Sequence, residues 1–138
     1  MRVEKFTQKM QEALQAAQDL ASQTQSSEIA NEHFLLALLE QADGVTRPLL
    51  EKLGLAPADL EARLRGELAR RPKVSGADVR LGNELRKTLD AAEREMAKLK
   101  DEFTSAEHYL LSLTNDSGPA SKALNDVGVS SRQLLQVL

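Results

Sequence analysis

The residues best suited to chemistry are two Glu-His pairs, Glu32-His33 and Glu107-His108. They contain both histidines of the chain, and each histidine has an acidic neighbour that could help bind a metal ion or move a proton. A zinc-protease helix needs the pattern His-Glu-x-x-His, which places two histidines on one face. Here the order is Glu-His, apolar residues follow, and no second histidine lies one turn away. We therefore expect no metal site and no catalytic residue, and we interpret both pairs as parts of helix starts.

Other catalytic patterns do not occur in this sequence. The seven glycines are isolated, and no G-x-x-x-x-G-K-[ST] motif is present. The chain therefore cannot hydrolyse ATP by the usual P-loop route. Serine, histidine and acidic residues show no spacing typical of a hydrolase, and there is no cysteine to act as a nucleophile. We expect this chain to be no enzyme and to bind no cofactor.

Composition excludes further classes of protein. Apolar residues make up 41% and charged residues 28% of the 138 residues, a balance typical of a folded globular domain. The net charge of −3 and the lack of a basic patch make nucleic acid a poor partner. The longest apolar run, residues 34–39, is far too short to cross a membrane. The charged start of the chain is unlike a signal peptide, so we expect a cytoplasmic protein.

The spacing of apolar residues predicts helices along nearly the whole chain. Residues 3–21 carry apolar side chains three or four apart, and residues 22–27 form a polar loop. A second helix follows and ends near Gly44. A short third helix has Pro48 in its first turn and stops at Gly54. Pro57 opens a fourth helix, and the apolar spacing of residues 81–99 predicts a fifth.

An internal repeat decides the fold. The segment IANEHFLLALL (residues 29–39) matches TSAEHYLLSLT (residues 104–114) at an offset of 75 residues, and the first helices match at the same offset. After one deletion the offset becomes 74, which aligns Gly54 with Gly128. Each half is too small to have a secure core alone. The sequence therefore predicts an all-α domain in which two pseudo-two-fold related four-helix repeats pack into eight helices.

The repeat boundaries follow from composition. The segment RRPKVSG (residues 70–76) has no apolar period and marks a linker. We place the first repeat at 1–70, the linker at 71–80 and the second repeat at 81–138.

Thr104 or Ser105 can cap the sixth helix, and Glu107 or His108 can reach back to a free backbone N–H in its first turn. The seam between the repeats is a natural place for a groove.

These motifs resemble the Clp N-terminal domain over the whole chain. The resemblance rests on RVEKFTQKMQEALQAAQDLA (residues 2–21), the doubled EH-[FY]-LL-x-L, LLEKLGL (residues 49–55) and the RRPKVSG linker. The linker makes the chain most similar to the N-domain of ClpB-type disaggregases. The resemblance implies that the chain is one domain of a longer AAA+ protein whose ATPase modules, with ATP and Mg²⁺, lie beyond it.

The resemblance also implies partners. Proteins of this family are hexamers that thread aggregated polypeptides through a pore and work with the DnaK-type chaperone system. Their N-domain binds exposed apolar segments of unfolded or aggregated clients, and we expect the isolated domain to be a monomer. Three alternatives stay open. The chain could be the N-domain of a ClpA- or ClpC-type unfoldase that docks adaptors for a protease, a stand-alone accessory protein, or an enzyme.

Candidate client-binding residues follow from the family motif. Thr7, Asp101 and Glu107 match polar positions that the family associates with client binding. The family's apolar groove runs along the fifth and sixth helices, where polar residues in this chain can shift the contact toward neighbouring aromatic residues. The remaining candidates are Leu89, Ala91, Glu95, Phe103, His108 and Tyr109.

Overall fold

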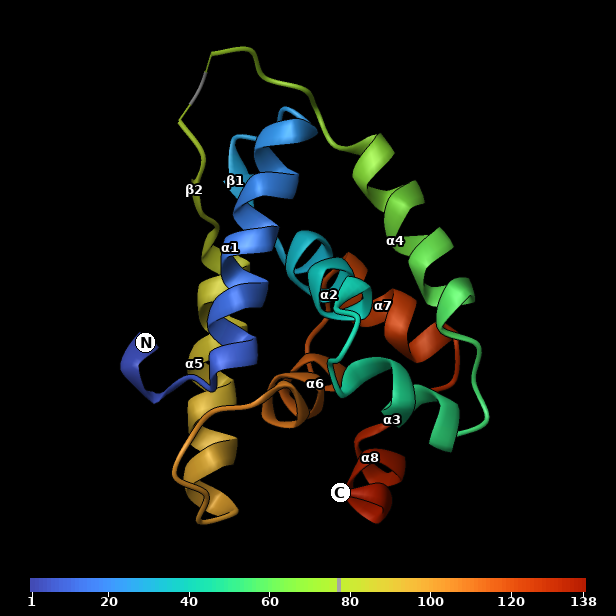
Figure 1. Cartoon of the computed structure of the whole chain (residues 1–138). Coiled ribbons are helices and arrows are strands. Elements are labelled where there is room, and N and C mark those ends of the chain that lie inside the picture. The colour runs from blue at the N-terminus through green and yellow to red at the C-terminus, as the bar shows by residue number, and fades with distance from the viewer. Residues whose placement is uncertain (77) are drawn as a thin grey trace.

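The computed structural model describes residues 1–76 and 78–138, and within them the chain forms eight α-helices (Figure 1). Ala77, which falls in the predicted linker, lies outside the described residues. The predicted all-α fold is confirmed. The elements in chain order are η1 (Val3–Lys5), α1 (Gln8–Gln23), β1 (Glu28–Ile29), α2 (Asn31–Glu40), α3 (Thr46–Lys52), α4 (Pro57–Arg70), β2 (Arg80–Leu81), α5 (Asn83–Lys98), α6 (Ala106–Thr114), α7 (Pro119–Asp126) and α8 (Ser131–Val137).

Glycine ends the third helix of each repeat, as the sequence predicts for the first. Gly54 follows α3 with φ +79°, and Gly128 follows α7 with φ +106°. Both lie in the left-handed region that favours glycine, which lets the chain reverse and satisfy the last carbonyls of the helix. The N–H of Leu55 donates to Leu50 O at 3.0 Å, and the N–H of Val129 donates to Leu124 O at 3.2 Å.

Three predicted helix boundaries were wrong. The first helix begins at Gln8 because Thr7 caps it, and residues 3–5 form a separate 3₁₀ turn. Leu81 and Leu99, predicted at the ends of the fifth helix, both lie outside α5. Leu81 belongs to β2, where it pairs in parallel with Ile29 of β1. A strand of two residues is too short to show the alternating apolar pattern by which strands are recognised in a sequence.

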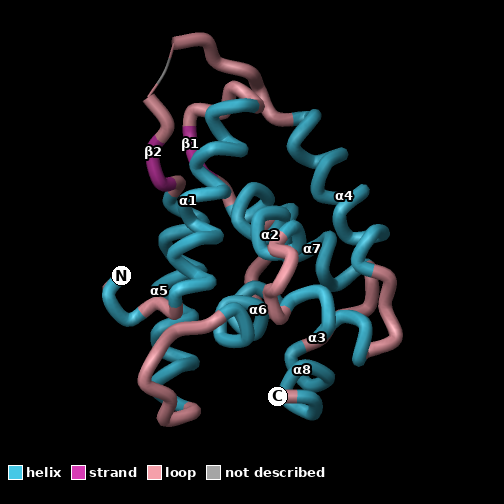
Figure 2. Tube along the Cα trace, in the orientation of Figure 1, coloured by secondary structure: helices cyan, strands magenta, loops and turns pink. Residues whose placement is uncertain are grey.

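The strand pairing shows how the repeats interlock. Ile29 pairs with Leu81, and an isolated parallel bridge joins Phe6 to Thr104. A shift of 75 residues turns one pair into the other. The segment before each repeat's first helix therefore pairs with the segment before the other repeat's second helix, and Figures 1 and 2 show β1 and β2 side by side. The repeats cannot be pulled apart without breaking both pairings.

The second helix of each repeat forms the centre of the domain. Residues 31–39 of α2 are all buried, and so are residues 108–113 of α6. In Figure 1 these two helices lie in the middle, with α1 and α4 against α2 and α5, α7 and α8 against α6. Phe34 and Tyr109 meet edge to face between them, with ring centroids 4.7 Å apart. One continuous apolar core joins the two repeats.

Candidate polypeptide-binding site

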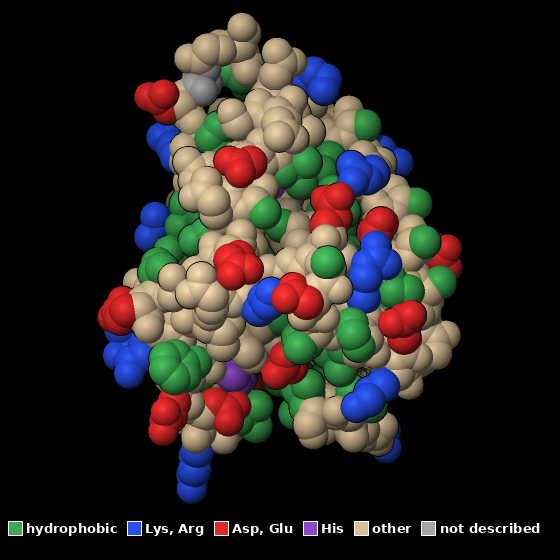
Figure 3. All heavy atoms as spheres, viewed as in Figure 1, with side chains coloured by type: hydrophobic (Ala, Val, Ile, Leu, Met, Phe, Trp, Pro, Cys, Tyr) green, Lys and Arg blue, Asp and Glu red, His purple; other side chains and the backbone are tan. Residues whose placement is uncertain are grey.

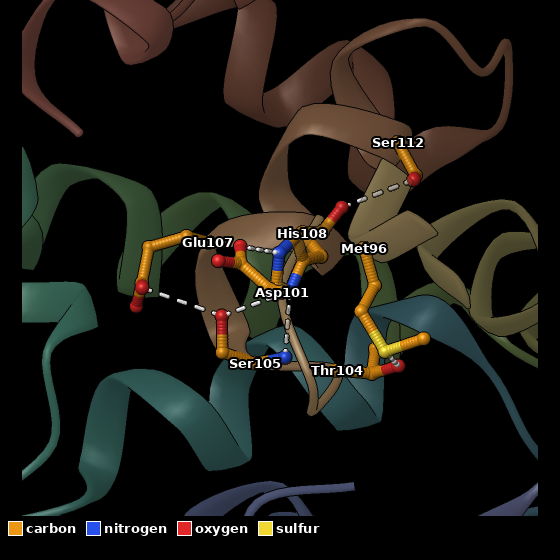
Figure 4. Close-up of polar contacts among 7 residues, drawn as sticks. All are labelled: Met96, Asp101, Thr104, Ser105, Glu107, His108 and Ser112. Atoms are coloured by element: carbon orange, nitrogen blue, oxygen red, sulfur yellow. Dashed lines mark hydrogen bonds and ion pairs between the residues drawn. The ribbon is translucent and has the colours of Figure 1, made fainter. Parts of the chain in front are cut away.

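The start of α6 is organised by His108. Its Nδ1 accepts the N–H of Ser105 at 2.9 Å, so the neutral ring carries its proton on Nε2. That nitrogen lies 2.7 Å from Asp101 Oδ2 and donates to it (Figure 4). The prediction that Glu107 or His108 would reach back to a free N–H is confirmed for His108. Because both ring nitrogens are engaged and the residue is only 3% exposed, His108 is a scaffold residue with no free atom for a ligand.

Four predicted residues gather around this start. Asp101 and Phe103 are exposed, and Glu107 is half-buried. Thr7, the residue that caps α1, joins them because its N–H donates to Thr104 O at 3.0 Å, next to Phe103 in the chain. We call these four residues the α6 entry site. Figure 3 shows acidic side chains gathered on the lower part of this face, over the segment between α5 and α6.

The polar groups of the α6 entry site differ in how far they are already occupied. The Thr7 hydroxyl accepts the N–H of Met10 and caps α1. Glu107 receives one hydrogen bond, from Ser105 Oγ at 3.3 Å, and forms no ion pair within the described part of the chain. Phe103 keeps 51% of its surface exposed. The site therefore offers solvent an aromatic ring and an uncompensated carboxylate.

Two other predicted residues, Ala91 and Glu95, line a hollow between α5 and α6. Its volume is about 290 Å³, and Ala91 is the one apolar side chain among its lining residues. Three cations and two carboxylates lie around it, with Lys98 paired to Glu95 at 3.4 Å. The apolar groove implied by the resemblance is thus replaced by a polar hollow at these positions. Its other lining residues are Lys87, Thr88, Arg94, Lys98, Ser112, Asn115 and Asp116.

Leu89 and Tyr109 were predicted to contact a client, and the structure places both in the core instead. Each is 0% exposed. Leu89 faces inward from α5 because it shares the apolar stripe of Leu85 and Ala92. The Tyr109 hydroxyl donates to Asn31 Oδ1 at 2.7 Å, so neither the ring nor the hydroxyl is available at the surface.

The equivalent site of the first repeat is filled by the chain itself. Arg71, which composition assigns to the linker, donates to Glu32 Oε2 at 2.9 Å and to Glu28 Oε1 at 3.0 Å. Glu32 has a side chain only 5% exposed, so this ion pair is largely shielded from water. The surrounding cleft measures about 70 Å³ and includes Gly82 and Ala120.

His33 has the same backbone bond as His108 but a different partner. Its Nδ1 accepts the N–H of Ala30 at 2.9 Å, and its Nε2 lies 3.1 Å from Ser26 Oγ, where His108 has Asp101. The ring is 0% exposed. Burial, and after it the positive charge of Arg71, lowers the pKa of His33 to about 4. The ring is therefore neutral at physiological pH.

A buried polar network, which sequence reasoning missed, joins the two repeats. Asn31 Nδ2 donates to Thr88 Oγ1 at 3.0 Å, while Asn31 Oδ1 accepts the Tyr109 hydroxyl. Thr88 Oγ1 also lies 3.2 Å from Asp116 Oδ2. The one sequence signal is that these residues break the repeat: Ala106 stands opposite Asn31, and Ala13 stands opposite Thr88. Arg71 had no such signal because the repeat alignment has no partner for it.

These features define a class of protein: an all-helical double-repeat domain with a rigid core and a polar and aromatic surface site at one repeat's central helix. The family described as the Clp repeat (R) N-terminal domain matches residues 5–137. The chain belongs to this family.

Curated relatives narrow the similarity to ClpB chaperones. The chain is 38% identical over 135 residues to chaperone protein ClpB 1 of Synechococcus elongatus, covering 96% of this chain and 15% of the relative. It is 34% identical over 140 residues to chaperone protein ClpB of Vibrio cholerae, covering 100% of this chain and 16% of the relative. The matched region is the N-terminal part of each relative, so the chain spans about a sixth of their length.

Solved structures share the fold. The N-terminal domain of ClpV1 from E. coli superimposes with a TM-score of 0.85 at 24% identity, covering 98% of this chain and 84% of that one. The Hsp104 N-terminal domain from Candida albicans gives a TM-score of 0.82 at 21% identity, covering 96% of this chain and 87% of that one. At these identities the likeness shows the fold alone.

The described residues, 1–76 and 78–138, offer neither a membrane-spanning helix nor a metal-binding cluster. No helix among them is both long and apolar enough to span a membrane. No group of three or more His, Cys, Asp or Glu side chains within them is placed to hold a metal ion. The matched family is the N-terminal Clp repeat region of AAA+ chaperones and not their ATPase module.

Proposed function

We propose that this domain captures exposed apolar segments of unfolded or aggregated polypeptides and presents them to a ClpB-type disaggregase. One observation carries the proposal: Phe103 is 51% exposed in the segment that leads into α6, where Glu107 forms no ion pair with a described residue, and the other aromatic rings are buried. A folded protein hides its apolar segments, whereas an aggregate displays them. An exposed ring next to a polar rim distinguishes the two.

The proposal predicts weak binding. A short extended segment that covers Phe103 gains apolar burial but must be ordered, which leaves a dissociation constant of about 10–100 μM. Weak capture suits a loading site because the client must then leave for the pore. Six linked copies in a hexamer raise the effective affinity by avidity. Support for polypeptide binding comes from a ClpV N-domain of the same fold, which forms a complex with a VipB peptide.

The rest of the proposed assembly lies beyond this chain. In this proposal the parent protein is a cytoplasmic homohexamer that uses ATP and Mg²⁺ in its ATPase modules and works with a DnaK-type chaperone system. The similarity to ClpB chaperones supports it. The isolated domain is a monomer with no cofactor of its own.

A second candidate function is the docking of a folded adaptor, as in ClpA- or ClpC-type unfoldases. The polar hollow between α5 and α6 favours it, because three cations and two carboxylates suit a complementary folded surface better than an apolar segment. The two functions use different surfaces. Substitutions in the α6 entry site therefore distinguish them from substitutions in the hollow.

The test is binding of a fluorescent unfolded client, reduced and carboxymethylated α-lactalbumin, to three forms of the domain. Phe103→Ala weakens binding by about three- to tenfold because it removes the exposed ring. The matched control is Leu135→Ala, since Leu135 is 53% exposed and lies on α8, and it leaves affinity unchanged. Equal affinities for all three forms, or no binding at several hundred micromolar client, would sink the proposal.

A further inference from the structure

We propose that Met96 is a peroxide-responsive modification site, at which oxidation of the thioether to the sulfoxide loosens the contact between the segment before α1 and the segment before α6. We call this contact, formed by Lys5, Phe6, Thr7, Met96 and Thr104, the Thr104 junction. The proposal goes beyond polypeptide capture. It depends on contacts within this chain and holds whether or not the domain binds a client.

Three parts of the chain meet at Thr104. Its carbonyl oxygen accepts the N–H of Thr7 at 3.0 Å, and its own N–H donates to Lys5 O at 2.7 Å. Its hydroxyl donates to Met96 Sδ at 3.3 Å, as Figure 4 shows, and this bond connects the paired segments to α5. Thr104 is 0% exposed, so water cannot replace a partner that it loses. The thioether of Met96 is therefore part of what holds the junction together.

The first repeat forms the same junction without sulfur. The 75-residue shift places Met96 on Ala21 and Thr104 on Ile29, so that an apolar pair stands in place of a thioether and a hydroxyl. The backbone bond between the repeats is nonetheless the same, because Gly82 N–H donates to Ile29 O at 3.0 Å. Peroxide does not oxidise alanine or isoleucine. The fold thus does not require a thioether at this place, and one of the two equivalent junctions carries an oxidisable group.

Met96 lies within reach of a small oxidant. It is 7% exposed and contributes to the wall of a surface hollow of about 430 Å³ between residues 1–2 and α5. Met10 on α1, by contrast, is 0% exposed. Hydrogen peroxide is little larger than water, so it can enter the hollow. We therefore expect Met96 to react in the folded protein, whereas Met10 reacts only after the core has opened.

The reaction is a two-electron transfer of oxygen from the peroxide to sulfur. A lone pair on Met96 Sδ attacks one peroxide oxygen, and the S–O bond forms as the O–O bond breaks. The transferred oxygen gives its proton to the departing hydroxide, and water leaves. Sulfur is oxidised and the peroxide is reduced, so the step needs no other reactant. The product is a polar, chiral side chain that methionine sulfoxide reductases convert back to methionine.

The junction cannot accommodate the sulfoxide without moving. The 3.3 Å between Met96 Sδ and Thr104 Oγ1 is shorter than an S–O bond and an O–H···O hydrogen bond laid end to end. The new oxygen therefore either pushes the Thr104 side chain away or turns from its donor and lies buried without a hydrogen bond, which costs free energy. In both cases the backbone bonds of Thr104 to Lys5 and Thr7 become easier to open.

The test combines peptide mass spectrometry with amide hydrogen exchange, measured by NMR on the domain treated with hydrogen peroxide. Sulfoxide should form at Met96 at least about tenfold faster than at Met10. In the oxidised protein the N–H of Thr7 should exchange about tenfold faster, whereas the N–H of Gly82, its counterpart in the first repeat, should exchange at an unchanged rate. Methionine sulfoxide reductases of both stereospecificities should together restore the original rate at Thr7.

The matched control is Met96→Leu, which keeps an apolar side chain of similar volume and has no sulfur. Peroxide should leave the exchange of its Thr7 N–H unchanged. Equal oxidation rates at Met96 and Met10, or oxidation of Met96 with no change at Thr7, would overturn the proposal. So would faster exchange at Thr7 in peroxide-treated Met96→Leu, or a rate in the wild type that the reductases do not restore. Client capture is tested separately by Phe103→Ala, so the two proposals can fail independently.

Discussion

The same Glu-His pair has different surroundings in the two repeats. In the first, Glu32 is covered and bound by Arg71, and His33 faces the neutral hydroxyl of Ser26. In the second, Glu107 has no ion-pair partner among the described residues, and its neighbour His108 faces the carboxylate of Asp101. The helix, its capping histidine and the buried face are the same in both. What differs is whether the described residues provide a cation that pairs with the glutamate.

The site of the first repeat is thus part of the folded scaffold, whereas the site of the second repeat is exposed at the surface. A repeat that fills its own site loses a binding surface, whereas a repeat that leaves the site open keeps a carboxylate and the Phe103 ring for a partner. In a domain with internal symmetry, one half can keep a binding surface while the other half closes its own, because the two halves share one core and stay together.

The largest effects should fall where the repeats are alike, in the core. Leu38 and Leu113 occupy equivalent places on α2 and α6 and are 1% and 0% exposed. Truncation of either to alanine should lower the free energy of unfolding by about 2–5 kcal/mol, since each leaves a cavity in the shared core. Denaturant unfolding should stay a single transition in both variants. Two separated transitions would show that the repeats fold independently and that the interlocked pairing does not couple them.

The next largest effect should come from His33 and depend on pH. Its pKa is about 4 in the folded state and near 6.5 when unfolded, so between these values the unfolded state binds more protons. Stability is therefore full above pH 6.5 and falls as the pH drops toward 4, by about 3 kcal/mol at most. Denaturant unfolding at pH 7 and pH 4.5 measures this loss.

The control for this pH effect is His33→Gln. Glutamine at this helix position can still accept the Ala30 N–H, but it does not titrate. The variant should lose less stability between pH 7 and pH 4.5 than the wild type does. An identical loss in both proteins would show that other groups, such as the carboxylates, carry the acid sensitivity.

A smaller effect should separate the two glutamates directly. Glu32→Gln weakens a shielded ion pair with Arg71 and should cost about 1–3 kcal/mol of stability. Glu107→Gln alters a carboxylate with one hydroxyl partner and should change stability by less than about 0.5 kcal/mol. Thermal or denaturant unfolding of both variants at pH 7 gives the comparison. Equal costs would mean that Glu107 is as structural as Glu32, which would remove it as a free ligand group.

The repeated architecture could be predicted from the sequence because the repeat is visible in the sequence itself. The offset of 75 residues, Gly54 and the capping role of the Glu-His pair are all local or periodic features, and the structure confirms them. The starts of the first and fifth helices were wrong because Phe6 pairs with Thr104 and Leu81 pairs with Ile29, and both pairings join residues far apart in the chain.

The binding site was less predictable than the fold. A family motif identifies positions but gives no side-chain direction, which is why Leu89 and Tyr109 were placed at a surface when they face the core. Arg71 looks like an ordinary linker residue in the sequence. Its role depends on Glu28 and Glu32, which lie about forty residues earlier and meet it through tertiary packing alone.

The central claim is that the second repeat, and not the first, receives a polypeptide. The most direct test is an NMR titration of the isotope-labelled domain with reduced, carboxymethylated α-lactalbumin. Binding at the second repeat should give fast-exchange shifts at Thr7, Phe103 and Glu107 and none at the equivalent Gly82, Glu28 and Glu32. Shifts of equal size at both sets, or shifts confined to the hollow around Ala91 and Glu95, would contradict it.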